Sequence, residues 1–396
     1  MRHLITFLFI SLLILCGCDE SRKDKVGAVP VITVDLSKEQ VKIDLKDLIK
    51  NASFIRLETN SDCLLRGVSK VGFYKDRIFV FDSSYPGHLY CFNLDGKFLF
   101  KVGNVGNGPR DYVSISDFIV DTENSCLWMG DDARKILQFD LDGNFVEKYT
   151  TDFSIRNLYL LDAKEISMAI RLGFYKEKDY SFIVYSLRDG KIHYEKSSEN
   201  VEVSRSVTSQ TFFKSKERVV YTEIFNDTIF TVSDKGLSPY YVVDFGSRKL
   251  PENLFDNPDL RNIMTQLNNP DNRYAGLITT PREISDILLF NYNFSGIKNT
   301  AFYSVGLNKI TSINEISYAG KTFNFLSGSF HLKQDNQVVY VLLPHLLMED
   351  DALSKGDSQQ NYGCYSDIDE FLPNLKADDN PIMIIGEFDS DKLFPH

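Results

Sequence analysis

Histidine, cysteine and tryptophan are scarce in this chain of 396 residues, which has 6 His, 6 Cys and a single Trp. No histidine stands in an H-E-x-x-H pattern or in a paired Cys/His spacing, so a structural zinc module is close to excluded. A basic block is also missing, because 55 Asp and Glu outnumber 44 Lys and Arg and leave a net charge of -11. Nucleic acids require clustered positive charge, so the composition argues against a nucleic-acid partner.

Apolar and aromatic residues are abundant: 43% of the chain is hydrophobic, and 30 Phe and 20 Tyr are present. This composition predicts a globular protein with a large core. Residues 4–15 form a mostly apolar run without charge behind Arg2 and His3, and 12 residues are too few to cross about 30 Å of hydrocarbon as a helix. The run therefore indicates a secretory signal.

The apolar run ends in Leu15-Cys16-Gly17-Cys18, which resembles the bacterial lipobox, whose Cys is diacylated and becomes the new N-terminus. We predict a lipoprotein signal peptide over residues 1–17 and lipidation at Cys18, which anchors the protein to a membrane without spanning it. An ordinary signal peptide with incidental cysteines is the alternative.

Residues 18–30 are predicted to be a flexible tether, because they are polar up to Lys25 and then contain Gly27 and Pro30. Asp19 and Glu20 directly follow Cys18. Acidic residues at this place are similar to the signal that sends lipoproteins to the cell surface in Gram-negative gut anaerobes, whereas an Asp here in enterobacteria suggests retention at the inner membrane. We expect an outer-membrane lipoprotein of the cell envelope that faces outward, and a periplasm-facing position stays open.

A repeat of about 47 residues follows the tether. The segment HLYCFNLDGKF at 88–98 recurs as RKILQFDLDGNF at 134–145, so Gly96 and Gly143 are 47 residues apart, and turns at Gly190 and Gly236 follow after 47 and 46. An Asp-Gly pair between alternating apolar runs is a strong hairpin signal. A repeat of this length with four strands is typical of a propeller blade. We therefore predict an all-β fold, a six-bladed β-propeller over residues 31–396.

Blades are expected near residues 66–103, 115–150, 155–196, 210–245, 282–314 and 328–388, and counts of five or seven stay open because the second half is less regular. Asn257 and Pro258 predict the start of a short helix between blades four and five, with apolar residues at 260, 263, 264 and 267. Residues 344–380 interrupt the last blade. Residues 31–36 are expected to close the ring beside residues 382–388.

Five segments carry a family resemblance: IFVFD at 78–82, LDGKFL at 94–99, GNGPRDY at 106–112, FNDTIF at 225–230 and DDNP at 378–381. The third is similar to a G-x-G-P-x-E-Y element, with Asp111 in place of Glu. With these segments the chain resembles the NHL-like six-bladed β-propeller lipoproteins of Gram-negative gut anaerobes. The resemblance implies the fold and says little about function, because propellers host unrelated activities.

Catalytic and metal motifs are weak. The GNVGNG segment at 103–108 lacks the spacing of a phosphate loop, so a role in shaping the crossing between two blades is favoured. Asp131 and Asp132 suggest a Ca²⁺ site like that of lactonase-type propellers, although turn capping is the favoured role. A nucleophilic triad is disfavoured because the histidines are scattered, at His88, His193, His331 and His345. We assign no catalytic residue and no metal ligand, and Ca²⁺ is the one cofactor left open.

Four cysteines follow the lipid cysteine: Cys63, Cys91, Cys126 and Cys364. In an exported protein they permit two disulfides with three pairings, or none.

The hairpins occupy one face of the predicted disc and leave the longer loops to the opposite face. There we expect ligand-binding residues on the loops of the first four blades: Asp82, Tyr85, His88, Arg110, Tyr112, Asp131, Asp132, Arg134, Arg171, Tyr175, Glu223 and Asn226. Aromatic rings beside charged groups suit sugars or peptide ends. We predict a non-enzymatic module that binds a glycan, a peptide or a partner protein, and a Ca²⁺-dependent hydrolase or lactonase is the alternative.

Overall fold

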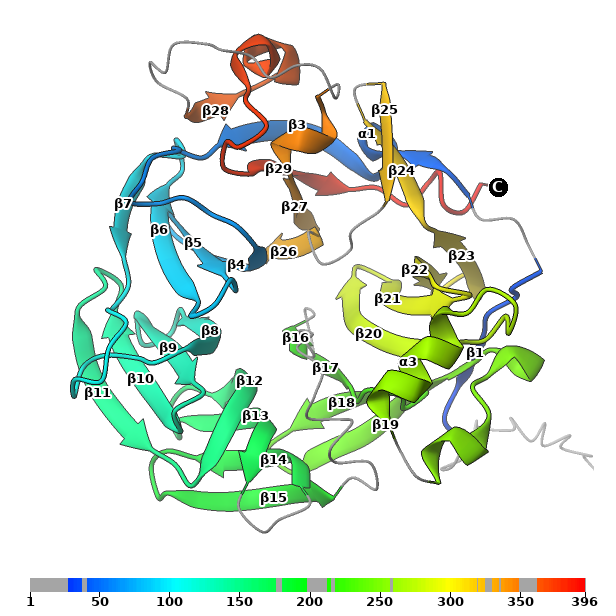
Figure 1. Cartoon of the computed structure of the whole chain (residues 1–396), viewed down its shortest axis with the longest axis horizontal. Coiled ribbons are helices and arrows are strands. Elements are labelled where there is room, and N and C mark those ends of the chain that lie inside the picture. Colours follow the sequence, from blue (N-terminus) through cyan, green and yellow to red (C-terminus); the bar gives the residue numbers. More distant parts are fainter. Residues whose placement is uncertain are drawn as a thin grey trace, which may run out of the picture.

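The computed structural model describes residues 28–37, 41–175, 180–197, 212–214, 218–256, 259–318, 320–324, 330–334, 336–348 and 362–395. Within these ranges the strands form seven sheets that stand around a ring (Figure 1). The predicted all-β propeller is confirmed, and the predicted count of six blades is wrong because the ring has seven. The signal peptide, Cys18 and most of the tether lie outside the described residues.

Blades 1 to 3 follow the predicted repeat, each as a four-stranded antiparallel sheet numbered from the inside outward. Blade 1 contains β4 (Val68–Tyr74), β5 (Arg77–Asp82), β6 (His88–Asn93) and β7 (Phe98–Lys101). Blade 2 contains β8 (Ile115–Asp121), β9 (Cys126–Asp131), β10 (Lys135–Asp140) and β11 (Phe145–Thr150). Blade 3 contains β12 (Phe153–Asp162), β13 (Ser167–Tyr175), β14 (Tyr180–Ser186) and β15 (Lys191–Ser197).

The predicted helix separates blades 4 and 5. Blade 4 contains β16 (Phe212–Lys214), β17 (Val219–Thr222), β18 (Thr228–Ser233) and β19 (Gly236–Asp244), and blade 5 contains β20 (Ala275–Ile284), β21 (Ile287–Phe294), β22 (Ile297–Ser304) and β23 (Lys309–Ile313). Between them the chain forms 3-10 turns at Gly246–Arg248 and Glu252–Phe255 and then α3 (Leu260–Asn268). Asp259 caps α3 by accepting from the Arg261 N–H at 3.0 Å, and the predicted cap Asn257 lies outside the described residues.

Blades 6 and 7 depart from the repeat. Blade 6 has three described strands, β2 (Ile43–Asp44), β24 (Glu315–Tyr318) and β25 (Lys321–Asn324). Blade 7 contains, from the inside outward, β26 (Phe330–Gln334), β27 (Gln337–Leu342), β29 (Ile382–Phe388), β3 (Ile49–Arg56) and β28 (Gly363–Tyr365). The insertion before β29 also forms 3-10 turns at Pro344–Leu346, Ile368–Glu370 and Leu372–Asn374. The sequence-based count missed blade 6 because its hairpin, at Gly320, lacks the Asp-Gly pair of the repeat and one of its strands comes from the N-terminal part of the chain.

Residues 31–37 and 41–56 form an N-terminal belt that pairs with four blades. β1 (Val31–Thr33) pairs in parallel with β19 of blade 4, and the Val41 N–H donates to the Ser312 carbonyl of β23 in blade 5 at 3.2 Å. β2 then pairs in parallel with β24, α1 (Leu45–Leu48) follows, and β3 pairs antiparallel with β29. Figure 1 shows β3 in blue beside β29 in red, so both parts of the chain close the ring. The prediction that residues 31–36 close the ring is wrong, because this segment pairs with the edge of blade 4.

Apolar side chains fill the spaces between neighbouring blades. Phe79, Phe118 and Phe139, for example, are at most 1% exposed and pack in one cluster between blades 1 and 2. Full burial of such a side chain contributes about 1.5–3 kcal/mol. Among the described helices, none has the length and apolar character needed to cross a membrane.

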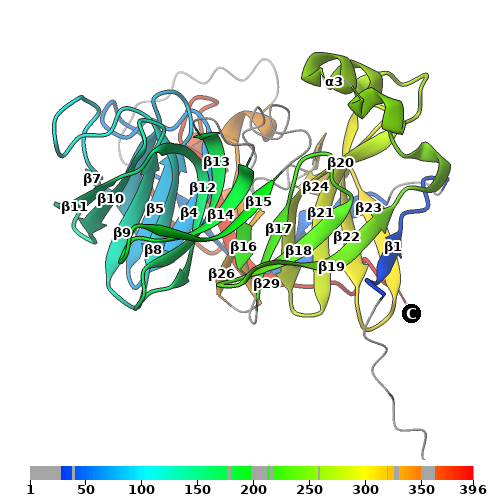
Figure 2. The same ribbon diagram turned by 90° about the horizontal axis from the view of Figure 1, so that it is seen from below.

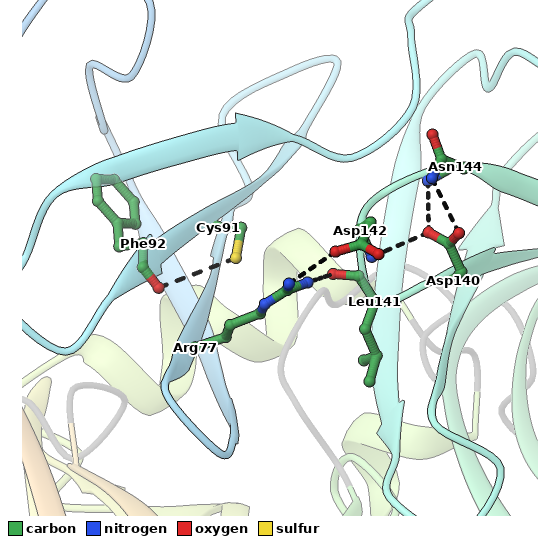
Figure 3. A network of polar contacts seen from close by, with 7 residues as sticks. All are labelled: Arg77, Cys91, Phe92, Asp140, Leu141, Asp142 and Asn144. Carbon is green, nitrogen blue, oxygen red and sulfur yellow. Dashed lines mark hydrogen bonds and ion pairs between the residues drawn. The ribbon is translucent and has the colours of Figure 1, made fainter.

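The predicted glycine hairpins of blades 1, 2 and 4 dock on the preceding blade. Gly96 has a φ of +78°, and a Cβ there would overlap the Arg56 carbonyl at the end of β3. In blade 2 the corresponding turn is also held by Arg77, which donates to the Leu141 carbonyl and lies 2.7 Å from the Asp142 carboxylate (Figure 3). These turns therefore contribute to the packing between blades. We call the face of the ring on which they lie the hairpin face.

Candidate ligand-binding site

The loops that join second to third strands, and the crossings from one blade to the next, lie on the face opposite the hairpin face. We call it the crossover face. The segment with α3 is such a crossing and rises above one side of the ring (Figure 2). Ile263 and Leu267 of α3 pack with Leu250, and Phe225 of the blade 4 loop joins this cluster. The helix therefore covers blades 4 and 5 on the crossover face.

Two of the predicted ligand-binding residues, Asp82 and Asp131, hold the backbone together. They end β5 and β9, and their side chains are at most 2% exposed. Each carboxylate accepts three backbone hydrogen bonds of 2.9 to 3.1 Å, from Arg66, Gly67 and Ser84 for Asp82, and from Val113, Ser114 and Ala133 for Asp131. Both residues tie the incoming crossing to the loop that follows the second strand.

The GNGPRDY segment shapes the crossing from blade 1 to blade 2. The Asp111 carboxylate accepts from the Gly108 N–H at 3.0 Å. Tyr112 is fully buried, and its hydroxyl lies 3.1 Å from Nδ1 of His88. Burial of His88, with a smaller effect from Lys101, lowers the pKa of this histidine. Tyr112 and His88 therefore form a contact inside the wall of the ring.

Other predicted residues are spread over the surface. Tyr85 is 86% exposed, and Arg110 is exposed with its guanidinium 5.9 Å from the Phe145 ring centroid. Arg134 is exposed at a φ of 62°. Asn226 caps its own turn by accepting from the Thr228 N–H at 2.9 Å. Tyr175 ends β13, and its side chain lies outside the described residues.

The structure brings Asp132, Arg171 and Glu223 into one group of polar side chains on blades 2 to 4. We call it the blade 2–4 polar cluster, and its members are Asp132, Arg156, Asn157, Arg171, Ser181, Lys196, Tyr221 and Glu223. Arg156 lies 3.5 Å from the Asp132 carboxylate at the partly exposed end of the cluster. Arg171 and Glu223 are buried deeper, at 2% and 6% exposure.

Hydrogen bonds organise the buried part of the cluster. Arg171 Nη1 donates to the Asn157 side-chain oxygen at 3.3 Å. Glu223 accepts from the Ser181 hydroxyl, and its other oxygen lies 2.6 Å from Lys196 Nζ. The Tyr221 hydroxyl is buried, and no hydrogen-bond partner for it is found in the described part of the chain.

Burial determines the electrostatics of the cluster. It lowers the pKa of Arg171, and Tyr221 and Glu223 oppose this effect. Burial also raises the pKa of Asp132, which Arg156 opposes and Asp131 reinforces. Since the cluster holds three cations and two carboxylates, it has an excess of positive charge inside an acidic protein.

Residues 29–387 match the model of a family described as "Domain of unknown function (DUF4934)". The chain belongs to this family. The NHL-like assignment made from sequence stays a prediction for this DUF4934 protein, and the six-bladed part of that assignment is wrong.

Solved structures share the fold of the DUF4934 chain. A "Putative exported protein" from Bacteroides fragilis superposes with a TM-score of 0.69 at 20% identity, over 90% of this chain and 99% of that one. A member of the duf4221 family from Bacteroides vulgatus matches with a TM-score of 0.47 at 8% identity, over 86% of this chain and 98% of that one. No curated protein matches by sequence. At 20% identity the likeness to the Bacteroides fragilis protein shows the fold alone.

Sequence reasoning missed five members of the DUF4934 polar cluster: Arg156, Asn157, Ser181, Lys196 and Tyr221. The available signal was the Arg156-Asn157 pair inside the otherwise apolar strand FSIRNLYLL, since polar side chains in an inner strand need partners. Neither residue stands on a loop, where ligand-binding residues were expected.

The described residues contain neither a candidate metal site nor a disulfide. No group of three or more His, Cys, Asp or Glu stands there in a position to hold a metal ion. Cys63, Cys91 and Cys126 are buried free thiols, and Cys364 is an exposed one. Burial raises the pKa of Cys63 and of Cys126 to about 11, so both stay protonated at neutral pH.

Proposed function

We propose that this chain is an exported lipoprotein, anchored through Cys18, whose propeller binds a ligand with an anionic group at the blade 2–4 polar cluster without converting it. Export and anchoring are supported by the Leu15-Cys16-Gly17-Cys18 motif and by the description of the Bacteroides fragilis relative. Binding is supported by the burial of Arg171 beside Glu223 and by the Tyr221 hydroxyl, for which the described residues offer no hydrogen-bond partner. Buried polar groups without full satisfaction are costly, which favours a functional reason for them.

The chemistry of the cluster favours a carboxylate in the ligand. Guanidinium groups such as those of Arg156 and Arg171 match a carboxylate in geometry and charge. The Asn157 amide beside Arg171 adds a polar group that fixes orientation. Acidic sugars and the carboxyl ends of peptides carry this group, so glycans and peptides are the proposed ligand classes, and a partner protein can present the same group.

The test is a glycan and peptide array, followed by affinity measurements on the best ligand. Arg156 is 34% exposed at its side chain, so Arg156→Gln is expected to leave the fold intact and to weaken binding at least tenfold. Lys148→Gln is the matched control, because it removes one exposed cation from β11 outside the cluster. Equal weakening by both variants would contradict this placement of the site.

Anchoring is tested separately. Cys18→Ala is expected to release the protein from the membrane fraction and to abolish labelling with radioactive palmitate. Protease accessibility on intact cells then distinguishes the outward-facing position from the periplasmic one. Retention of the variant in the membrane fraction with undiminished labelling would contradict the proposed anchor.

Thermal unfolding separates the binding module from a Ca²⁺-dependent hydrolase. A bound ion stabilises the folded state by mass action. We expect the same unfolding midpoint in Ca²⁺ and in EDTA. A higher midpoint in Ca²⁺ would favour the hydrolase.

A further inference from the structure

The junction between blades 2 and 3 differs from the junctions on either side of it. At those two junctions the hairpin glycine of the following blade packs on an aromatic ring of the preceding blade: Gly143 packs on Phe100, and Gly236 packs on Tyr194. A Cβ added to Gly190, the corresponding glycine of blade 3, would meet no atom of blade 2 within 4 Å among the residues described. The hairpin of blade 3 therefore stands apart from the blade that precedes it.

The sequence repeat explains this difference. Phe100, Glu147 and Tyr194 are spaced by 47 residues, and each follows the register shift in the outer strand of its blade. A bulge changes the face to which the following side chain points. Glu147 is exposed, and it accepts a hydrogen bond from the Tyr149 hydroxyl of its own strand at 2.8 Å. Blade 2 thus carries a carboxylate at the position where both neighbouring blades carry the docking ring.

The docking ring of blade 1 is accompanied by a cation. The Arg77 guanidinium lies 5.7 Å from the centroid of the Phe100 ring. It donates to the Leu141 carbonyl of the blade 2 hairpin and lies 2.7 Å from the Asp142 carboxylate (Figure 3). The residue 47 positions after Arg77 is Asn124, which has no positive charge. Blade 2 therefore lacks both the ring and the cation with which blade 1 holds the next hairpin.

A groove of about 540 Å³ lies at the junction of blades 2 and 3, and we call it the blade 2–3 groove. It is bordered by the crossing that follows β11 and by the start of β15, and Figure 1 shows the end of β11 beside the start of β15. Phe153, Tyr185 and Ile192 contribute its apolar surface, and Asp152 and Lys191 contribute charge. The groove therefore combines an apolar wall with a polar rim.

The charged groups of the groove are accessible to a ligand. Asp152 and Lys191 are exposed, and neither the carboxylate nor the ammonium is engaged by an ion pair or a side-chain hydrogen bond in the described part of the chain. Asp189 stands next to Gly190, 47 residues after Asp142, and its side chain is 42% exposed. Two carboxylates are thus available to a cation that enters the groove, and one of them has the repeat position of the carboxylate that faces a cation in blade 2.

We propose that the blade 2–3 groove binds a partner peptide that presents an aromatic side chain close to an arginine or a lysine. The aromatic ring packs on the Gly190 hairpin and on Ile192, as Phe100 packs on the hairpin of blade 2, and the cation faces Asp152 and Asp189. A cavity of about 150 Å³ holds a benzene molecule, so the groove has room for both side chains. This site goes beyond the proposed function, because it is separate from the blade 2–4 polar cluster and takes a cationic ligand.

The test is calorimetric titration of the full-length protein with the peptide acetyl-Ser-Arg-Ser-Phe-Ser-amide. Its blocked ends carry no carboxylate, and the spacing of two places both long side chains on one side of an extended chain. The peptide is expected to bind, and exchange of its Phe for Ala or of its Arg for Gln is expected to weaken binding at least tenfold. Arg156→Gln in the protein is expected to leave this binding unchanged, which separates the groove from the polar cluster.

Glu147→Phe tests the place of the ring. It supplies blade 2 with the ring that Phe100 and Tyr194 supply elsewhere, so it is expected to fill the groove, to weaken binding of the peptide at least tenfold and to raise the unfolding midpoint. Glu123→Phe is the matched control, because it places the same ring at an exposed position in the turn between β8 and β9. It is expected to leave binding unchanged.

Asp152→Asn tests the place of the cation. The variant is expected to weaken binding of the peptide with Arg and to leave the affinity for the peptide with Gln unchanged. The two exchanges together form a double-mutant cycle, which isolates the interaction between the two charges.

Three results overturn the proposal. The first is an absence of binding of the peptide to the folded wild type at millimolar concentration. The second is equal affinity for the peptides with Phe and with Ala, which reduces the interaction to charge attraction. The third is a folded Glu147→Phe variant that binds the peptide as the wild type does, which places the binding site outside the groove.

Discussion

Gly96 shows how closely single residues control the docking of blades. Its φ of +78° is unfavourable for a side chain, and a Cβ would overlap the Arg56 carbonyl. Gly96→Ala is therefore expected to lower the free energy of unfolding by about 3 kcal/mol, from the left-handed backbone and the overlap together. Urea unfolding followed by circular dichroism measures the change.

Gly190 is the matched control for that variant. It has a similar φ of +67° in the same turn of blade 3, and the nearest atom to its missing Cβ is the Tyr185 hydroxyl at 3.8 Å. A groove of about 540 Å³ lies beside it, bordered by Thr150 and Lys191. Gly190→Ala is expected to cost only about 1 kcal/mol, from the backbone alone. Equal costs for the two variants would show that docking against Arg56 contributes nothing.

His331, on β26, is expected to make the stability of the fold depend on pH. It is 5% exposed, its Nε2 has no hydrogen-bond partner in the described part of the chain, and burial with Arg282 and Lys70 lowers its pKa well below 6.5. Below pH 6.5 the unfolded chain binds a proton that the folded protein does not. The free energy of unfolding therefore falls with decreasing pH, by about 1.4 kcal/mol per pH unit from this residue.

The measurement is urea unfolding between pH 7 and pH 5. His331→Leu is expected to reduce the pH slope by this amount, since the variant has no titrating group there. An unchanged slope in a folded variant would assign the pH dependence to other groups.

At the scale of elements, an ion pair fastens β3 to the loop before β29. Arg56 Nη2 lies 2.6 Å from the Asp379 carboxylate, and the two side chains are 2% and 3% exposed. Asp379→Ala leaves a buried cation without its partner, so the free energy of unfolding is expected to fall by about 3–5 kcal/mol. Urea unfolding provides the value.

The double variant Arg56→Met with Asp379→Leu separates charge from packing. Replacing a buried ion pair with apolar residues is often neutral. We expect the double variant to recover most of the stability lost in Asp379→Ala. If it is as unstable as the single variant, the loss comes from the hydrogen bonds of Asp379 to its own loop, such as that with the Lys376 N–H at 2.9 Å.

Elements with local signals were predictable from the sequence. The hairpins at Gly96 and Gly143 and the helix α3 follow from short patterns, and the structure confirms them. β3 was not predictable in the same way, because its partner β29 is remote in the chain and nothing in residues 49–56 identifies that partner. The same holds for β2 in blade 6, which has only two residues.

The site was predictable only in outline. Topology predicted on which face the loops lie, but an aspartate that caps a turn and one that binds a ligand look alike in sequence. Asp131 and Asp132 are neighbours, yet Asp131 is saturated by backbone N–H groups and Asp132 faces Arg156. That distinction depends on the side chains contributed by other blades, which a single sequence does not show.

At the scale of the whole molecule, seven blades around one ring make each blade depend on its two neighbours. The apolar clusters lie between blades, and the hairpin of each of the blades 1, 2 and 4 packs on the preceding blade. Such a ring has no free sheet edge at its closure, because β3 fills the place beside β29. Stability is thus a property of the closed ring more than of any blade.

The N-terminal belt also determines the order in which parts of the ring can fold. Arg56 and Asp379 are 323 positions apart, so β3 leaves the ribosome long before the strand it must join. Until β27 and β29 have been made, β3 has no sheet to enter, and the belt has only blades 4 to 6 to hold it. Pairing at such sequence separation is slow. Closure of the ring is therefore the last step of folding. A chain that ends before β29 cannot close the ring, even when its first four blades have folded.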